Sequence, residues 1–102
     1  MPAATRKGDL CTGHNGWPAR PSTQGSPNVK INGIPAVRVG DRYAKHGRWV
    51  PSGDDRVWSE HDGQLSTGSS SVRINGRAAG RVGDAVDCGS KVAQGSPNVR
   101  FG

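Results

Sequence analysis

The chain contains two short stretches in which apolar and charged residues alternate. Residues 29–31 read Val-Lys-Ile and residues 72–74 read Val-Arg-Ile. Such alternation is typical of a half-buried β-strand, because successive side chains of a strand point to opposite faces. The pattern therefore predicts a short strand at each place.

An Asn-Gly pair follows each predicted strand, at 32–33 and at 75–76. Both central residues of a tight two-residue hairpin turn need positive φ, which Asn and Gly adopt most readily. We therefore predict two β-hairpins, whose second strands are 36–39 and 79–82.

No stretch of the chain has sustained helical periodicity, and its 16 Gly and 7 Pro interrupt nearly every window. This predicts an all-β fold of short hairpins joined by long loops. All histidines and tryptophans fall in the expected loops. We expect Trp17, Trp49 and Trp58 to pack as lids over a small core.

The predicted hairpins belong to an internal repeat. Residues 25–41 align with 68–84 without a gap, and residues 95–102 form a truncated third copy. Three Gly-Asp pairs divide the chain into units that begin near residues 8, 40 and 83. We expect the aspartates of these pairs to cap turns, and the alternative is that they orient metal-ligand imidazoles. These aspartates are Asp9, Asp41 and Asp84.

Composition limits the core that this chain can form. It has 102 residues, of which 31% are hydrophobic, so we expect a single domain over residues 1–102 with a thin core and an added crosslink. Cys11 and Cys88 allow one disulfide. However, no apolar run near the N-terminus would form a signal peptide, so we expect synthesis in the reducing cytoplasm, which favours free thiols or metal ligands.

The repeat places metal-binding residue types at equivalent positions. His14 and His46 lie at the same distance in sequence after the first glycine of their units. Cys88 lies one residue closer to the first glycine of its unit. His61, the remaining histidine, completes a set of four donors. Imidazole and thiolate in a closed four-donor set are typical of one structural Zn²⁺.

Cys11 is the remaining candidate for a metal ligand. It aligns with Tyr43 and Val86 of the other units, which favours a place in the core. It stays the alternative should one of the four proposed ligands fail.

Two other functions are open to this composition. Glu60 beside His61 could act as the general base of a small zinc-dependent hydrolase, but four protein donors leave no position for a water. The net charge of +6 would suit a nucleic-acid-binding module. However, the 14 Lys and Arg residues are spread along the chain, without zinc-finger spacing or a basic helix. The sequence therefore favours a structural protein that is no enzyme and binds no specific nucleic acid.

These motifs resemble those of the PAAR-repeat family. The resemblance rests on the opening residues 2–6, the loop at 12–16, and the repeated Val-x-Ile-Asn-Gly that precedes Val-Gly-Asp. The Pro-Ala-Ala-Arg motif occurs in altered form, with Thr5 inserted in the first copy and with Val37 in place of an alanine at 35–38. The likeness covers essentially the whole chain.

The resemblance implies a cone-shaped β domain with a zinc ion near the apex, bound by His14, His46, His61 and Cys88. It also implies a place on the trimeric β-helical spike of a type VI secretion system or a contractile phage tail, with one chain per trimer. The protein would be the membrane-piercing tip, would contact the target membrane transiently, and could recruit effector cargo noncovalently. It would be delivered outside the cell with the spike, or be located in the virion tail.

Three sequence units agree with this expectation, because one chain can cover a trimeric surface evenly only if its own contact surface is roughly three-fold. Strands at that surface would pair with the exposed strand ends of the spike. Loops at the other end would converge to form the point.

Overall fold

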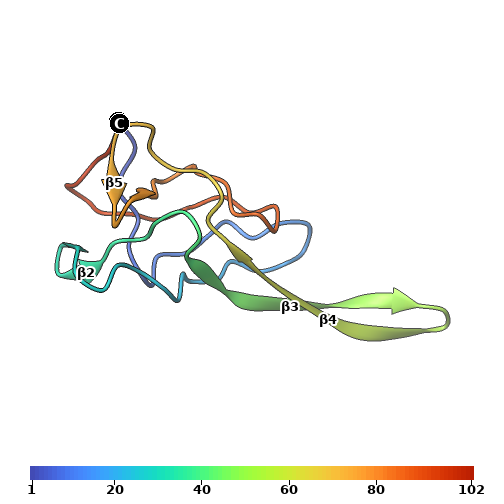
Figure 1. The fold of residues 1–102 in the computed structure, drawn as a ribbon. Helices are drawn as coiled ribbons and strands as arrows, with labels where there is room; N and C mark the ends of the chain where they lie inside the picture. The colour runs from blue at the N-terminus through green and yellow to red at the C-terminus, as the bar shows by residue number, and fades with distance from the viewer.

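A computed structural model describes residues 1–102, which contain six β-strands and no helix (Figure 1). The strands are β1 (Lys30–Ile31), β2 (Ile34–Pro35), β3 (Arg42–Ser52), β4 (Asp55–Gln64), β5 (Arg73–Ile74) and β6 (Arg77–Ala78). They form three separate antiparallel pairs, β1 with β2, β3 with β4, and β5 with β6. The predicted all-β fold is confirmed. The structure has no helix that is both long and apolar enough to span a membrane.

The two Asn-Gly hairpins are present, but their second strands begin earlier than predicted. Asn32 and Gly33 have φ of 55° and 76°, and the pair at 75–76 has nearly the same values. Because the turn has only two residues, the next residue enters the ladder at once, and Ile31 pairs with Ile34. The predicted second strands at 36–39 and 79–82 are therefore wrong. Ala36 and Ala79 bond within their own copies, and the residues that follow them bond to other copies.

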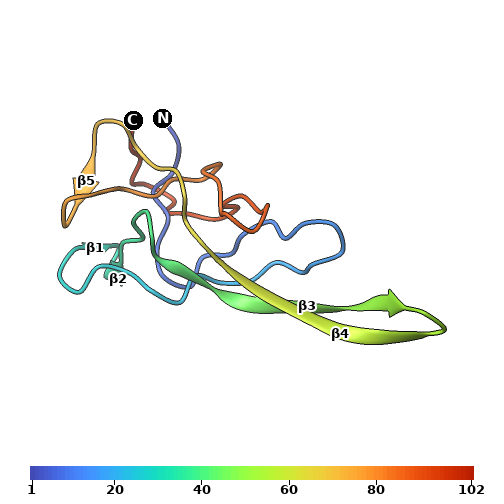
Figure 2. The same cartoon turned by 45° about the vertical axis from the view of Figure 1, so that its right-hand side comes forward.

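The third copy of the repeat is assembled from both ends of the chain. Ala4 donates its N–H to the carbonyl of Val99 at 2.9 Å and accepts the N–H of Ser96 at 2.7 Å. Ala36 and Ala79 make the same two bonds within the other copies. The N-terminal segment thus continues the C-terminal copy in space, and the two chain ends lie side by side (Figure 2).

The three copies surround a pseudo-three-fold axis. The N–H of Thr5 donates to Gly80, Gly80 donates to Val37, and Val37 donates back to Thr5, with N···O distances of 3.1, 2.9 and 3.2 Å. A second closed ring joins the flanking residues, with the bonds Lys7 to Pro35, Val39 to Ala78, and Val82 to Ala3. Two closed rings of backbone hydrogen bonds tie the three copies together where few apolar side chains are available.

The core consists of two small clusters of repeat-equivalent side chains. One contains Ala4, Ala36 and Ala79, all fully buried, with Ile31 and Ile74. The other contains Cys11, Val37, Tyr43, Leu65, Val86 and Val92. Cys11 is 2% exposed, so its predicted place in the core is confirmed. Both cysteines are free.

The predicted turn-capping role of the Gly-Asp aspartates is confirmed in all three units. Asp41 accepts the backbone N–H of Arg38 at 2.8 Å through Oδ2, and its own N–H donates to the Arg38 carbonyl at 3.0 Å. Asp9 and Asp84 make the same two contacts within their turns. The central glycine of each turn has φ of 92–94°, a conformation that side chains disfavour.

The longest predicted loop is instead a long hairpin of β3 and β4, which projects from the body (Figures 1 and 2). Cross-strand pairs between Trp49 and Trp58 and between Val50 and Val57 stabilise it. The molecule consequently extends over 50 × 24 × 22 Å. The hairpin tip, and not a set of converging loops, is therefore the most distant point.

The predicted role of the tryptophans is only partly correct. Trp49 and Trp58 are 53% and 51% exposed on the projecting hairpin, so they cover no core. Trp17, in contrast, is half-buried and packs against histidine side chains. Sequence position could not distinguish these cases, because a hairpin and a loop can contain the same residues.

Candidate metal centre

The structure brings the four predicted ligands together. His14, His46, His61 and Cys88 place their donor atoms within 4.8 Å of one another. The Nε2 atom of His61 lies 3.0 Å from Nε2 of His14 and 2.6 Å from Nε2 of His46. Bonds of about 2.0 to 2.3 Å to one ion require donors within roughly 4 Å of each other, so the set is close to a mononuclear arrangement.

The four donors come from three local structures. His46 and His61 are directly paired residues at the base of the β3–β4 hairpin, so the predicted location of both in loops is wrong. His14 begins a two-residue turn closed by its N–H bond to the Trp17 carbonyl at 3.0 Å. Cys88 lies in the turn closed by the bond from Val86 N–H to Ser90.

The tautomer of His46 follows from its neighbour. Its Nδ1 atom lies 2.8 Å from the carbonyl oxygen of Pro18. A carbonyl can only accept, so Nδ1 carries the proton and Nε2 presents a lone pair to His61. Metal-binding histidines are commonly oriented in this way, by a hydrogen bond from the ring nitrogen that does not bind the metal.

The convergence of three Nε2 atoms favours a cation at their centre. Nε2 of His46 has no proton, and Nε2 of His61 can donate a proton to only one of its two neighbours. At most one of the two short N···N contacts can therefore be a normal hydrogen bond, and a positive ion at the centre would bind the lone pairs that remain. The residues present thus suit a metal ion, and the cluster could hold one.

An aromatic lid covers the histidines. The Trp17 ring lies 4.1 Å from the His61 ring and 5.4 Å from the His46 ring between centroids. The Arg48 guanidinium lies 5.2 Å from the Trp17 centroid and donates to the Asn15 carbonyl at 2.7 Å. The Trp17 ring and the Arg48 guanidinium above it together limit the access of water to the cluster.

Two glycines make room for the donors. A Cβ atom on Gly63 would lie 3.0 Å from the sulfur of Cys88 and 2.9 Å from a methyl group of Val86. Gly89, at φ of 103°, lies beside the His14 ring. Larger residues at either position would displace a donor.

The environment favours the neutral form of two imidazoles, those of His14 and His61. Burial, followed by the charges of His46, His61 and Arg48, lowers the pKa of His14. Burial and the neighbouring His46 also lower the pKa of His61. A neutral imidazole is the form that binds a metal.

The other candidate residues lie elsewhere. Cys11 is buried in the core, where it accepts the N–H of Arg20 at 3.4 Å. Glu60 precedes His61 on β4, and successive side chains of a strand point to opposite faces. Glu60 instead lines a pocket together with Trp58 and the candidate ligand His46.

No role at this site was predicted for Trp17, Pro18 or Gly63. The carbonyl of Pro18 leaves no signal in a sequence, since any residue supplies a carbonyl. Gly63 stands two residues after His61, and its position beside a candidate ligand was the one signal available.

Comparison with known proteins agrees with the repeat pattern. The family model described as PAAR motif matches residues 58–102, which include His61, Cys88 and the third Gly-Asp turn. No curated protein matches the chain. The equivalent turns around Asp9 and Asp41 extend the same structural pattern over the remainder. Residues 58–102 therefore carry a PAAR motif, and the rest of the chain repeats its turn geometry.

Proposed function

We propose that this protein is the metal-stabilised tip of a trimeric β-helical spike in a contractile injection machine, with one chain per trimer. The PAAR motif supports a spike-tip protein of this kind. Spike-tip proteins of this family are structural, and we propose no enzymatic activity. The machine is either a type VI secretion system or a phage tail.

The observation that carries the proposal is the closed hydrogen-bond ring of Thr5, Val37 and Gly80. It makes one chain pseudo-three-fold at the level of its backbone. A trimeric spike ends in a three-fold surface, and a pseudo-three-fold chain can make similar contacts with all three subunits.

The spike-facing surface is proposed to be the end that carries β1–β2, β5–β6 and the chain termini. This end lies opposite the β3–β4 hairpin (Figure 1). Lys30 on β1 and Arg73 on β5 are exposed there at equivalent positions. Their short strands leave backbone groups that the strand ends of a spike could pair.

We propose that His14, His46, His61 and Cys88 bind one structural Zn²⁺. Imidazole nitrogen and thiolate sulfur suit zinc, and four protein donors form a closed site. Zinc would crosslink all three units, and its binding energy would supplement the small core. The protein would be made in the cytoplasm, assembled on the spike and delivered outside with it, where its end would transmit the force of contraction to the target membrane.

The test is binding to the trimeric spike protein of the same machine. Native mass spectrometry of the purified mixture should find one copy of this chain per spike trimer. Lys30→Glu with Arg73→Glu should weaken binding at least about tenfold, whereas Arg56→Glu on the hairpin should not. No complex, or three copies per trimer, would contradict the proposal.

A further inference from the structure

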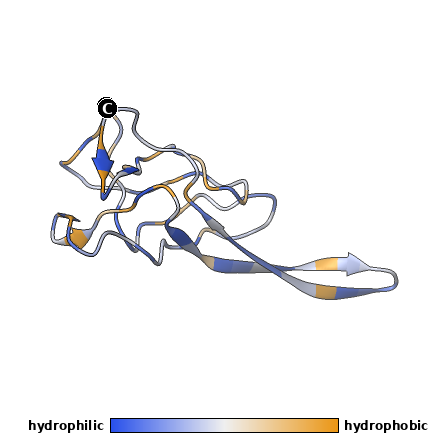
Figure 3. Ribbon diagram, in the orientation of Figure 1, coloured by the Kyte–Doolittle hydropathy of each residue, from blue (hydrophilic) through white to orange (hydrophobic).

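The distal half of the β3–β4 hairpin is apolar on both faces. Trp49 and Trp58 pair across the strands on one face, and Val50 and Val57 pair on the other. Trp49, Val57 and Trp58 are each about half exposed, at 53%, 49% and 51%. Figure 3 shows hydrophobic bands on both arms of the projecting hairpin. A two-stranded ribbon in water normally keeps one face polar, so two apolar faces indicate that another molecule covers the hairpin.

The strand edges of this hairpin are also free. β3 and β4 form a sheet of two strands, and the bridge between Ser22 and Tyr43 joins β3 to the body only at its start. Beyond Arg48, which donates to Asn15, no hydrogen bond connects the hairpin to the body. Isolated two-stranded hairpins are only marginally stable, and a free edge can accept another strand.

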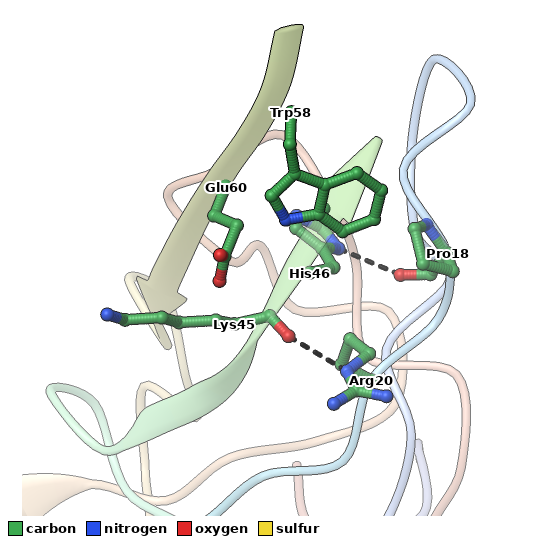
Figure 4. A pocket seen from close by; sticks show the side chains of 7 residues that line it. Pro18, Arg20, Lys45, His46, Trp58 and Glu60 are labelled. Atoms are coloured by element: carbon green, nitrogen blue, oxygen red, sulfur yellow. Dashed lines mark hydrogen bonds between the residues drawn. The ribbon is translucent and has the colours of Figure 1, made fainter. Parts of the chain in front are cut away.

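A charged pocket lies where β3 leaves the body (Figure 4). Its volume is about 360 Å³, and Arg20, Lys45, Trp58 and Glu60 contribute to its lining. Nε of Arg20 donates to the Lys45 carbonyl at 2.9 Å, which holds the guanidinium at the pocket. None of the three charged side chains, Arg20, Lys45 and Glu60, forms an ion pair.

Gly47 shapes this pocket. A Cβ atom at this position would overlap the indole ring of Trp58, so only glycine lets that ring lie across β3. Trp58 therefore forms an apolar wall beside the cations of Arg20 and Lys45. Trp and Arg are the residue types that contribute most often to the binding energy of protein interfaces.

We propose that the free edge of β3 binds an extended segment of a partner protein as a third strand. The segment has alternating apolar side chains, which pack against the tryptophan face and the valine face. An acidic side chain at one end enters the pocket and pairs with Arg20 and Lys45. This surface adjoins the metal centre, because His46 and Pro18 also line the pocket, and it is separate from the proposed spike-facing end. It adds a binding role to the tip.

A lipid bilayer is a poorer occupant for two reasons. Asp54 and Asp55 place two carboxylates at the hairpin turn, which would lead any insertion into the membrane. The unpaired backbone groups along both edges would also enter the hydrocarbon without hydrogen bonds. A protein strand satisfies one of those edges.

The proposal is tested with a phage-displayed library of random peptides of about twelve residues, enough for one strand. Selection uses the metal-loaded full chain, and counter-selection uses the double variant Arg20→Glu with Lys45→Glu. We expect enrichment of peptides in which apolar residues alternate and an acidic residue stands near one end. Their affinity should fall at least about tenfold for the double variant and stay unchanged for Lys30→Glu, an exposed site on β1 at the opposite end of the molecule (Figure 1). Selection on the double variant should instead enrich peptides with Lys or Arg at that position.

Amide shifts measured by NMR locate the bound peptide. The largest changes should fall on residues 45–52 of β3 and on the Trp58 indole, with smaller changes on residues 55–57. Equal metal content and equal melting temperature of wild type and variants exclude misfolding as the cause. Enrichment that ignores the charge reversal, or shifts confined to β4, would overturn the proposal.

Two further measurements distinguish the competing occupants. Phosphatidylcholine and phosphatidylglycerol vesicles should leave the tryptophan fluorescence of the protein unchanged, and a blue shift without peptide binding would assign the hairpin to lipid. Sedimentation should find a monomer. A dimer that Trp58→Ala dissociates would assign the surface to a second copy of the chain.

Discussion

Arg38 binds both carboxylate oxygens of Asp41. Its Nε donates to Oδ2 and its Nη2 donates to Oδ1, each at 2.9 Å, and its backbone N–H adds a third bond at 2.8 Å. The side chains are only 7% and 3% exposed. The hydrogen bond to Asp41 raises the pKa of the Arg38 guanidinium, so Arg38 keeps its positive charge. The same pairing recurs at Arg6 with Asp9 and at Arg81 with Asp84.

Replacement of Arg38 by alanine should leave the carboxylate of Asp41 buried with a single distant cation, Arg77 at 3.8 Å. We expect the free energy of unfolding to fall by about 3 kcal/mol, because a buried charge without its partner is costly. Urea unfolding measures this change. Arg42→Ala is the control, since its pair with Asp62 is 3.7 Å long and about half exposed and should contribute less than about 1 kcal/mol. Equal losses in both variants would contradict the buried-pair interpretation.

Loss of a proposed ligand should remove the metal. We expect about one zinc per chain in the wild type, and depletion in His14→Ala, His46→Ala, His61→Ala and Cys88→Ala. Elemental analysis measures the zinc, and melting curves should show a lower melting temperature after chelation. Cys11→Ala should keep its zinc, because Cys11 is buried in the core. Retention of zinc in Cys88→Ala together with its loss in Cys11→Ala would show that the ligand assignment is wrong.

The metal-free protein should lose stability in acid. His14 and His61 have folded-state pKa values below the ordinary 6.5, so the unfolded chain binds more protons in that range. The stability is fully present above about pH 6.5 and falls as the pH drops through the lowered pKa values. Melting temperatures measured after chelation at about pH 7.5 and about pH 5 should show this decrease. The double variant His14→Gln with His61→Gln should show a smaller decrease, and an equal one would assign the acid sensitivity to other groups.

Tyr43→Phe should not destabilise the protein. The Tyr43 hydroxyl is buried without a hydrogen-bond partner, and burial is the main reason that its pKa is raised far above the ordinary 10.0. Removal of an unsatisfied buried hydroxyl should leave the free energy of unfolding unchanged or raise it by about 1 kcal/mol. Thermal and urea unfolding measure the effect. Tyr43→Ala is the contrasting variant, which should lose about 3 kcal/mol through the cavity it leaves. A loss above about 1 kcal/mol in Tyr43→Phe would indicate a hydrogen bond of that hydroxyl.

The repeat made much of the site predictable. His14, His46 and Cys88 occupy equivalent places in three units, so a shared structural frame brings them to one end of the axis. His61 has no counterpart in the other units, and it joins the set because β4 places it directly opposite His46. The contacts around the ligands could not be predicted, since the Pro18 carbonyl and the Trp17 ring reach the histidines only through the packing of separate segments.

By itself, the sequence determined the local geometry of this protein. Asn-Gly pairs select two-residue turns, and the Gly-Asp pairs select capped turns, because both depend on neighbouring backbone torsions and hydrogen bonds. Only the tertiary structure decided how the units close around an axis, with Ala4 completing the copy that contains Ser96. It also decided that residues 42–64 form a projecting hairpin with exposed tryptophans. Both outcomes depend on pairing between distant segments, and alternation within a single segment carries no information about its partner.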